Sequence, residues 1–349
     1  MMRTYLSRPE DPMSAPDLPR AVTLAVRGLS AGFTTDEGRF KAVDDVSFDI
    51  LRGESVGLVG ESGCGKSVTA LSILRLIPSP PGFIEAESIS YNNVNLVELP
   101  TAKLRSIRGR DISMIFQEPL SALSPLHRIG RQMVETLRLH QNISREAGRQ
   151  TAASWLQRVG IPDPATRMNA YPYQLSGGMQ QRVMIAMALM LSPGLIIADE
   201  PTTALDVTTQ AQVFELIKEM KQKHTAMLLI THDMGVVWEM CDRVMIMYAS
   251  RIIESGARID IFERPRHPYT IGLLNAIPRL SGNKTRLADI PGRVPSPLEY
   301  PKGCHFIKRC GYAGRRCAME KPPLYDCGKD HRAACFLLGP GTGDLKTEP

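Results

Sequence analysis

Long apolar runs are missing from this 349-residue sequence. No run approaches the about 20 apolar residues that a membrane-spanning helix needs. Residues 1–20 are polar and rich in proline, and they lack the apolar stretch of a secretory signal peptide. We therefore expect residues 1–20 to be a disordered leader, and any role at a membrane would require separate membrane-spanning subunits.

Aromatic residues are also few, at 6% of the sequence, and the net charge is a modest +6. Surfaces that bind nucleic acid need a concentrated basic patch with aromatic residues among the charges. The basic residues here are mostly scattered, which favours an ordinary solvated surface, and we expect no nucleic-acid partner. One denser basic group lies near the C-terminus: Lys302, Lys308, Arg309, Arg315 and Arg316.

Paired Cys-x2-Cys motifs, which are usual in structural zinc sites, are absent as well. Four cysteines near the C-terminus instead have the spacings C-x5-C, C-x6-C and C-x17-C. Four thiolates would suit an iron–sulfur cluster, although this spacing is not a common ferredoxin pattern. The spacing alone leaves a cluster, a zinc site and free thiols open. The four residues are Cys304, Cys310, Cys317 and Cys335.

The sequence does contain a glycine-rich loop of the form G-x-x-x-x-G-K-S at residues 60–67. An apolar strand precedes it and a helical run follows, which is the context in which this pattern binds nucleotides. Glycines let backbone N–H groups converge on an anion, Lys66 adds a full charge, and Ser67 offers a hydroxyl to Mg²⁺. We therefore predict a nucleoside triphosphate site formed by Gly60, Glu61, Ser62, Gly63, Cys64, Gly65, Lys66 and Ser67.

Further short motifs follow in a fixed order. They are Gln117 in M-I-F-Q-E-P, the segment L-S-G-G-M-Q-Q at 175–181, an apolar strand ending in Asp199 and Glu200, A-L-D at 204–206, and an apolar strand ending in His232. Each motif alone is weak, but the whole set in register over residues 60–232 is specific. It resembles the motif set of ATP-binding-cassette (ABC) ATPases, and the resemblance covers residues from about 21 to 265.

The resemblance implies roles in phosphoryl transfer, which needs positioned charge more than covalent chemistry. Asp199 would contact Mg²⁺ through water, since Mg²⁺ keeps several waters. Glu200 would point to the other side of the strand and accept a proton from the attacking water, as the family's catalytic glutamate does. His232 would touch the γ-phosphate and orient that water. Gln117 would sense Mg²⁺ and water, and would couple the site to whatever docks nearby.

The adenine ring needs a flat partner, and base–aromatic stacking contributes about 1–3 kcal/mol. Phe33 lies near the end of the first predicted strand, as the A-loop aromatic does in the family. Phe40 is the alternative, because residues 34–39 resemble a loop that could shift the register. We prefer Phe33 as the residue that stacks on adenine.

The family architecture also implies a partner subunit. Ser176, Gly177 and Gly178 would not reach this chain's own phosphate loop but would cap the nucleotide held by a second ABC ATPase subunit. The hydrolytic unit would then be a head-to-tail dimer, here a heterodimer, with two ATP molecules between the subunits. The helix from Met179 to Leu191 is apolar nearly all round, which predicts that it is buried.

Changes in pattern divide the chain. We expect an α/β fold in which residues 21–265 form a P-loop NTPase core of the ABC type, with an inserted helical subdomain at about 118–175. Helices are predicted from Arg128 to His140 and from Ser144 to Val159. A proline-rich change near residue 265 marks a small, loop-rich, cysteine-containing C-terminal domain over residues 266–340, followed by a tail over 341–349.

The C-terminal region narrows the resemblance. His267-Pro268-Tyr269-Thr270 and the cysteine-bearing segment from Gly303 onward resemble the extension of dipeptide and oligopeptide importer ATPases. In that subfamily the four cysteine positions can hold a [4Fe–4S] cluster, so the resemblance favours a cluster over zinc. Cys327 does not match the four-cysteine pattern and is interpreted as a free thiol.

The resulting hypothesis is an ATPase subunit that hydrolyses ATP to drive uptake of peptides or related small solutes. ATP, Mg²⁺ and a [4Fe–4S] cluster would be its cofactors. It would pair with a second ATPase subunit and two membrane-spanning permease subunits at the cytoplasmic face of the inner membrane, and a solute-binding protein would deliver the cargo. The alternatives are a DNA-repair or chromosome-type ABC ATPase, which would carry Cys-x2-Cys zinc modules or coiled coils, and an exporter ATPase.

Overall fold

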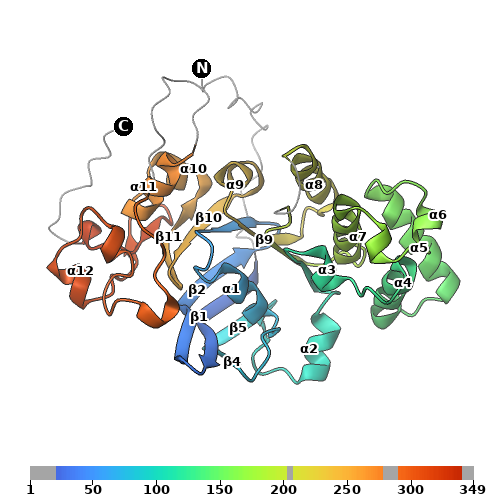
Figure 1. The fold of residues 1–349 in the computed structure, drawn as a ribbon, viewed down its shortest axis with the longest axis horizontal. Coiled ribbons are helices and arrows are strands. Elements are labelled where there is room, and N and C mark those ends of the chain that lie inside the picture. The colour runs from blue at the N-terminus through green and yellow to red at the C-terminus, as the bar shows by residue number, and fades with distance from the viewer. Residues whose placement is uncertain (1–20, 203–206, 278–289, 340–349) are drawn as a thin grey trace, which may run out of the picture.

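The computed structural model describes residues 21–202, 207–277 and 290–339. Within these ranges the chain forms two β-sheets with helices around them (Figure 1). The predicted leader at 1–20, the A-L-D motif at 204–206 and the tail at 341–349 lie outside the described residues.

The first sheet is antiparallel, and two long paired strands, β1 (Val22–Thr35) and β2 (Gly38–Leu51), form most of it. They pair from Val22↔Leu51 to Thr35↔Gly38, with several register shifts along the way. Apolar side chains such as Leu24, Val26 and Leu29 are fully buried beneath it. The strands run in the order β2, β1, β5 (Ser88–Tyr91) and β6 (Val94–Asn95), and β4 (Gly82–Glu85) also pairs with β1.

The second sheet has a parallel centre. Its central strands β3, β8 and β9 are buried along their whole length, as expected where helices cover both faces of parallel strands. Parallel pairing joins β10, β3, β9, β8 and β7. The full order is β12 (Tyr325–Asp326), β13 (Arg332–Ala333), β11 (Arg251–Ala257), β10 (Arg243–Tyr248), β3 (Ser55–Val59), β9 (Ala226–Thr231), β8 (Leu195–Asp199) and β7 (Ile112–Ile115).

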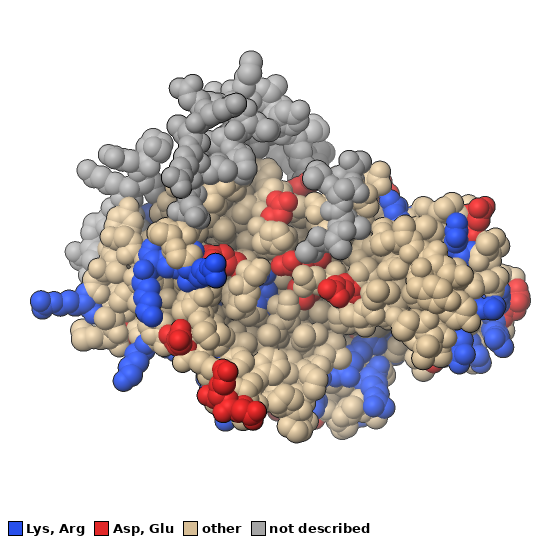
Figure 2. Space-filling view, in the orientation of Figure 1, with Lys and Arg blue, Asp and Glu red and all other residues tan. Residues whose placement is uncertain are grey.

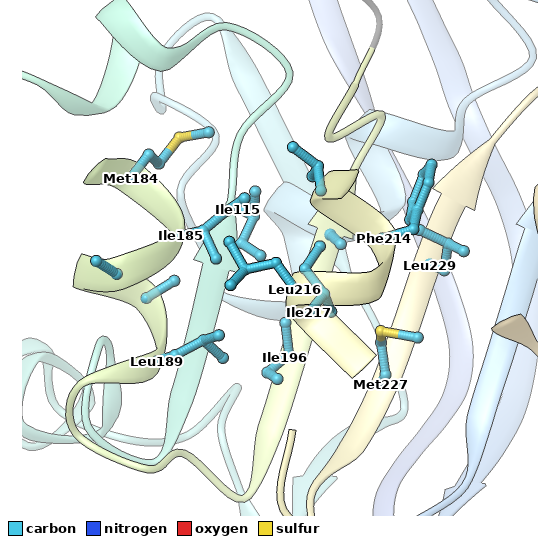
Figure 3. Packing of buried hydrophobic residues seen from close by; sticks show 14 of the residues in the cluster. Ile115, Met184, Ile185, Leu189, Ile196, Phe214, Leu216, Ile217, Met227 and Leu229 are labelled. Carbon is cyan, nitrogen blue, oxygen red and sulfur yellow. The ribbon is translucent and has the colours of Figure 1, made fainter. Parts of the chain in front are cut away.

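Alternate residues of β8 show how the sheet divides the interior. Ile196 and Ala198 belong to one buried cluster, whereas Leu195 and Ile197 belong to the other. Figure 3 shows part of the first cluster, in which residues of helices α7 and α8 pack over the strands. The residues labelled there are Ile115, Met184, Ile185, Leu189, Ile196, Phe214, Leu216, Ile217, Met227 and Leu229.

Helices surround the sheets and build the lobe on the right of Figure 1. They are α1 (Lys66–Ile73), α2 (Thr101–Ile107), α3 (Pro119–Ala122), α4 (Ile129–His140), α5 (Arg145–Arg158), α6 (Pro164–Arg167), α7 (Gly177–Leu189), α8 (Val207–Met220), α9 (Met234–Met240), α10 (Arg258–Glu263), α11 (Pro268–Asn275) and α12 (Arg315–Met319). Short 3-10 turns include η4 (Ile307–Arg309).

Two of these helices occur where the sequence predicted them. α4 begins at Ile129, one residue after the predicted start, and α5 occupies Arg145–Arg158 within the predicted span. Ser144 caps α5, because its side chain accepts a hydrogen bond from the backbone N–H of Ala147. These helices and the short α6 lie together at one end of the molecule (Figure 1).

The C-terminal region is joined to the second sheet. β13 pairs with β11 through Glu254↔Ala333 and Ser255↔Arg332, and β12 pairs with β13. Phe306 and Tyr269 are buried in the same apolar cluster as the centre of the sheet. The region therefore shares the sheet and the core of the nucleotide-binding part, whereas its proline-rich sequence indicated a separate loop-rich unit.

The described residues contain no helix that is long and apolar enough to span a membrane. Figure 2 shows Lys and Arg side chains dispersed at both ends of one face, with Asp and Glu side chains among and between them.

Candidate functional site

Four parallel strands end at the same edge of the second sheet. β3 leads into the glycine-rich loop, β8 ends at Asp199, β9 is followed by His232, and β7 is followed closely by Gln117. Since β3, β9, β8 and β7 are neighbours in this order, their carboxyl ends lie side by side. Crevices at this edge are where α/β proteins bind ligands. The sheet topology thus gathers the predicted residues at one place.

The loop at residues 60–67 requires glycine at two positions in particular. A Cβ atom on Gly60 would lie 2.1 Å from the carbonyl oxygen of Met247. Gly65 has φ of 110°, in the left-handed region, and a Cβ there would lie 2.2 Å from the carbonyl oxygen of Ala42. Gly65 also directly precedes α1, so the loop leads straight into the N-terminus of that helix. A helix N-terminus attracts anions.

Lys66 is the buried cation of this loop. Its Nζ donates to the carbonyl oxygens of Gly60 at 2.8 Å and Glu61 at 3.1 Å. The same Nζ lies 3.9 Å from Glu200 Oε1. The side chain is only 5% exposed, so its charge acts in a region from which water is largely excluded. Lys66 therefore links the loop to the carboxylates at the end of β8.

Ser67 and Asp199 form the pair of oxygen ligands that Mg²⁺ would need. Ser67 Oγ donates to Asp199 Oδ1 at 3.0 Å. Burial raises the pKa of Asp199, and the neighbouring Glu200 raises it further, against the opposing effects of the Ser67 hydrogen bond and Lys66. A divalent cation would reverse this by stabilising the ionised form. A hydroxyl beside a buried carboxylate therefore fits Mg²⁺, which prefers oxygen ligands.

Glu200 turns toward the loop. The prediction that it points to the other side of the strand was wrong, because β8 ends at Asp199 and the alternation of a strand does not extend to Glu200. Its φ is 42°, in the left-handed region, where a non-glycine residue costs on the order of 1–3 kcal/mol. Both carboxylates consequently meet consecutive residues, Asp199 at Ser67 and Glu200 at Lys66.

His232 and Gln117 are exposed residues at this edge of the sheet. His232 Nδ1 lies 3.5 Å from Glu200 Oε1, and its side chain is 61% exposed. Gln117 is exposed, between β7 and α3. Both side chains can therefore be reached by a bound nucleotide or by another subunit.

Comparisons with known proteins identify the family. The family model described as "ABC transporter" matches residues 43–203, and the model described as "Oligopeptide/dipeptide transporter, C-terminal region" matches residues 253–317. The "Dipeptide transport ATP-binding protein DppD" of Escherichia coli is 46% identical over 313 residues, which cover 89% of this chain and 95% of that protein. The "Oligopeptide transport ATP-binding protein OppD" of Bacillus subtilis is 44% identical over 328 residues, covering 93% and 91%. This chain belongs to the ABC transporter ATP-binding family, in its dipeptide and oligopeptide transport branch.

Solved structures of this ABC family share the fold. The dimeric post-hydrolysis structure of the cassette MJ0796, bound to ADP and Pi, matches with a TM-score of 0.58 at 27% identity, over 67% of this chain and 98% of that one. CbiO1 from Clostridium perfringens matches with a TM-score of 0.57 at 25% identity, over 72% and 95%. The predicted ABC ATPase core is therefore confirmed.

The ABC signature lies on a different helix from the phosphate loop. Ser176 caps α7, and its side chain accepts a hydrogen bond from the Met179 backbone N–H at 3.4 Å. Ser176 and Gly177 are exposed, and a Cβ atom on Gly177 would meet open space. Beyond its first turn α7 is largely buried, as predicted from its apolar residues. The exposed start of α7 is thus available to a partner.

The two candidate adenine-stacking residues face each other. Phe33 and Phe40 are paired across β1 and β2, with ring centroids 5.9 Å apart. The residues between them form the end of a regular hairpin. The two rings are therefore neighbours on paired strands, and no shift of register is needed to bring either one to this position. Both are half-buried.

The four predicted cysteine ligands line one cavity. Cys304, Cys310, Cys317 and Cys335 border a space of about 280 Å³, and Cys327 does not. Burial raises the pKa of Cys304 and of Cys335 to about 11, so these thiols stay protonated at neutral pH without a metal. Across the described residues, however, no three His, Cys, Asp or Glu side chains are arranged to hold a metal ion. Four cysteine thiols could bind a metal or cluster as thiolates. In this structure, however, they line the cavity without pointing to one common position.

Two residues at the phosphate loop were missed by the sequence analysis. Tyr269 OH accepts a hydrogen bond from the backbone N–H of Glu61, and Arg309 pairs with the Glu61 carboxylate. Tyr269 belongs to the H-P-Y-T motif, which served only to identify the family branch. Arg309 belongs to the denser basic group near the C-terminus; its side chain is only 5% exposed, so it is not part of the ordinary solvated surface expected for the basic residues.

Proposed function

We propose that this chain is the ATP-hydrolysing subunit of an importer of dipeptides, oligopeptides or related small solutes. The convergence of the phosphate loop with Asp199, Glu200 and His232 at one sheet edge supports ATP hydrolysis. The curated relatives named as dipeptide and oligopeptide transport ATP-binding proteins support the transported class.

Each residue at this edge has a role in the proposed reaction. Lys66 and the N–H groups of the loop other than that of Glu61 hold the phosphates, and Phe33 stacks on adenine. Glu200, held near Lys66 and His232, accepts the proton of the attacking water. His232 orients that water, and Gln117 carries changes at the site to the exposed surface beside α3. When Mg²⁺ is bound, Ser67, Asp199 and Gln117 would hold it, and it would neutralise charge on the phosphates.

A second ABC ATPase subunit completes the proposed site. The signature residues Ser176, Gly177 and Gly178 would cap the nucleotide on that subunit, and its signature would cap the nucleotide here. The dimeric structure of MJ0796 supports this arrangement by analogy. We favour a heterodimer, bound to two membrane-spanning permease subunits at the cytoplasmic face of the inner membrane, with a solute-binding protein that delivers the cargo.

The organisation of the chain is part of the same proposal. Residues 21–265 would form the nucleotide-binding domain, with the helical subdomain at about 118–175. Residues 266–340 would form the C-terminal module, which begins after β11 and α10 and uses β12 and β13 to extend the sheet.

A [4Fe–4S] cluster would bind in the C-terminal module. Cys304, Cys310, Cys317 and Cys335 supply four thiols to one cavity, and Cys327 stays outside it. A cluster would draw these thiols together as thiolates and hold the loops of the module, as metals do in other small domains. A zinc site is the alternative for the same four residues.

Isolation of the tagged full chain from its native membranes tests the proposed function. We expect two membrane-spanning proteins and a second ABC ATPase to be retained, with an ATPase activity that rises when peptide-loaded binding protein is added. The same complex with Glu200→Gln should assemble but lose that stimulation. Isolation without membrane proteins would refute the importer function, and an ATPase activity indifferent to peptide would refute peptides as the transported class.

A further inference from the structure

Arg309 of the C-terminal module reaches directly into the phosphate loop. Its Nη1 donates to both carboxylate oxygens of Glu61, at 2.9 and 3.0 Å, across 248 residues of sequence. The Arg309 side chain is 5% exposed and that of Glu61 is 31% exposed. Charge-assisted hydrogen bonds of this kind are about twice as strong as neutral ones, and burial reduces their screening by salt.

The guanidinium of Arg309 is held from several directions. Nε donates to the carbonyl oxygen of Pro291 at 2.9 Å, and Nη2 donates to that of Ile290 at 3.1 Å. Nη1 also lies 3.5 Å from the hydroxyl of Tyr248 on β10. Because its donors are fixed by backbone acceptors of the module, Arg309 is preorganised before it meets Glu61.

A second contact from the same region holds the backbone of Glu61. Tyr269 on α11 is fully buried, and its hydroxyl accepts the Glu61 N–H at 3.1 Å. Its ring lies 5.5 Å from that of Phe306 and 4.7 Å from that of Tyr248, which places it in an aromatic cluster shared by the module and β10. The start of the loop is therefore held by a fully buried tyrosine within an aromatic cluster.

All the polar groups of Glu61 are thus engaged. Its N–H is bound to Tyr269, its carbonyl oxygen accepts from Lys66 Nζ at 3.1 Å, and its carboxylate pairs with Arg309. A carboxylate in a loop that binds polyphosphate would repel the ligand unless a cation compensates it. Arg309 supplies that cation.

We propose that Arg309 is a positioning residue for the phosphate loop, and that through the Arg309–Glu61 pair the C-terminal module sets the affinity of this subunit for ATP. The inference rests on the proposed function of the loop as an ATP site. It gives the module a role in cis, on the nucleotide bound by the same chain. Arg309 also ends the turn η4 just before Cys310, so the cysteine-lined cavity and the phosphate loop are joined through one short segment.

Titration of the purified full chain with Mg-ATP and with Mg-ADP tests this role. We expect Arg309→Ala to weaken ATP binding about tenfold, within the range typical of coupling between two sites. The loss should be smaller for ADP, because the unpaired Glu61 carboxylate repels the more highly charged ligand more strongly. In the assembled transporter KM for ATP should rise while kcat changes much less.

A double variant separates charge compensation from simple damage. Glu61→Gln in the Arg309→Ala background removes the unpaired carboxylate, so it should restore most of the lost affinity. An unfolded module would not be rescued by a change in the loop. ATP affinity of Arg309→Ala within twofold of wild type, or an equal loss in the single and double variants, would overturn the proposal.

Two further variants complete the design. Lys308→Ala removes a neighbouring exposed positive charge from the same turn and should leave ATP affinity unchanged, whereas a loss equal to that of Arg309→Ala would indicate only a general charge effect. Lys66→Ala should abolish tight ATP binding in any case. If Lys66→Ala has no effect, the proposed ATP site itself is wrong; if Lys66→Ala abolishes binding but Arg309→Ala does not weaken it, only the role of Arg309 fails.

Discussion

Glu200 Oε1 lies 3.9 Å from Lys66 Nζ and 3.5 Å from His232 Nδ1, so one carboxylate oxygen stands between the buried cation of the phosphate loop and the exposed imidazole after β9. This position suits a base that receives a proton close to the bound phosphates. The left-handed φ of Glu200 brings its side chain there, which a continuing strand would not do.

Glu200→Gln should keep ATP binding but lower hydrolysis at this site by roughly 10²–10⁴, the usual contribution of a general base. Glutamine has the same shape but does not accept the proton. The measurement is single-turnover hydrolysis in a complex whose partner site is disabled. Turnover close to wild type would remove Glu200 from this role.

Phe33→Ala should weaken binding of adenine nucleotides by about 1–3 kcal/mol, the stacking contribution of one base. Phe40→Ala is the matched control, because the two rings face each other across one hairpin. Calorimetric titration of both variants with ATP measures the difference. An effect confined to Phe40→Ala would assign the stacking role to Phe40.

Ser176→Arg should leave ATP binding by the isolated chain intact, since Ser176 is exposed at the start of α7 and would serve the nucleotide on the partner subunit. The same variant should block hydrolysis in the assembled pair, where the arginine would fill the closing interface. Loss of ATP binding by the isolated, folded variant would contradict the composite site.

The cysteine-lined cavity predicts a specific pattern of metal content. Anaerobically purified protein should be brown and contain about four irons per chain, as a [4Fe–4S] cluster requires. Cys310→Ser should bleach the colour and make the region from about residue 290 sensitive to protease. Cys327→Ser is the matched control and should change neither colour nor iron content, because Cys327 does not line the cavity. About one zinc per chain without iron would instead indicate a structural zinc site.

His267 predicts a pH dependence of stability. Burial lowers its pKa from the ordinary 6.5 to about 4, and its Nδ1 accepts the Tyr269 N–H at 3.0 Å. Between pH 4 and pH 6.5, His267 binds a proton in the unfolded chain but not in the folded chain. Stability is therefore fully present above pH 6.5 and decreases as the pH falls toward 4, by up to about 3 kcal/mol.

His267→Asn tests that pH dependence. Asparagine retains a side-chain acceptor for the start of α11 but does not titrate. Denaturant unfolding at pH 7.5 and pH 5 should therefore show a smaller loss of stability in the variant than in wild type. Parallel losses in the two proteins would mean that other groups cause the acid sensitivity.

The sequence by itself determined the parts of this protein whose chemistry is local. The phosphate loop at 60–67 could be identified because glycine, lysine and serine act there through their immediate backbone, and the helices α4 and α5 could be predicted from the residues of their own segments. The fully buried strands β3, β8 and β9 were recognisable as short apolar runs before the functional residues.

Only the tertiary structure decided how distant segments meet. Pairing of β13 with β11 joins the C-terminal region to the sheet, although its prolines indicated a separate unit. The contact between Arg309 and Glu61 depends on that packing, and a basic residue among others carries no signal in the sequence for which carboxylate it will meet. The direction of Glu200 likewise depends on where β8 ends, because one backbone dihedral beyond a strand reorients the whole side chain.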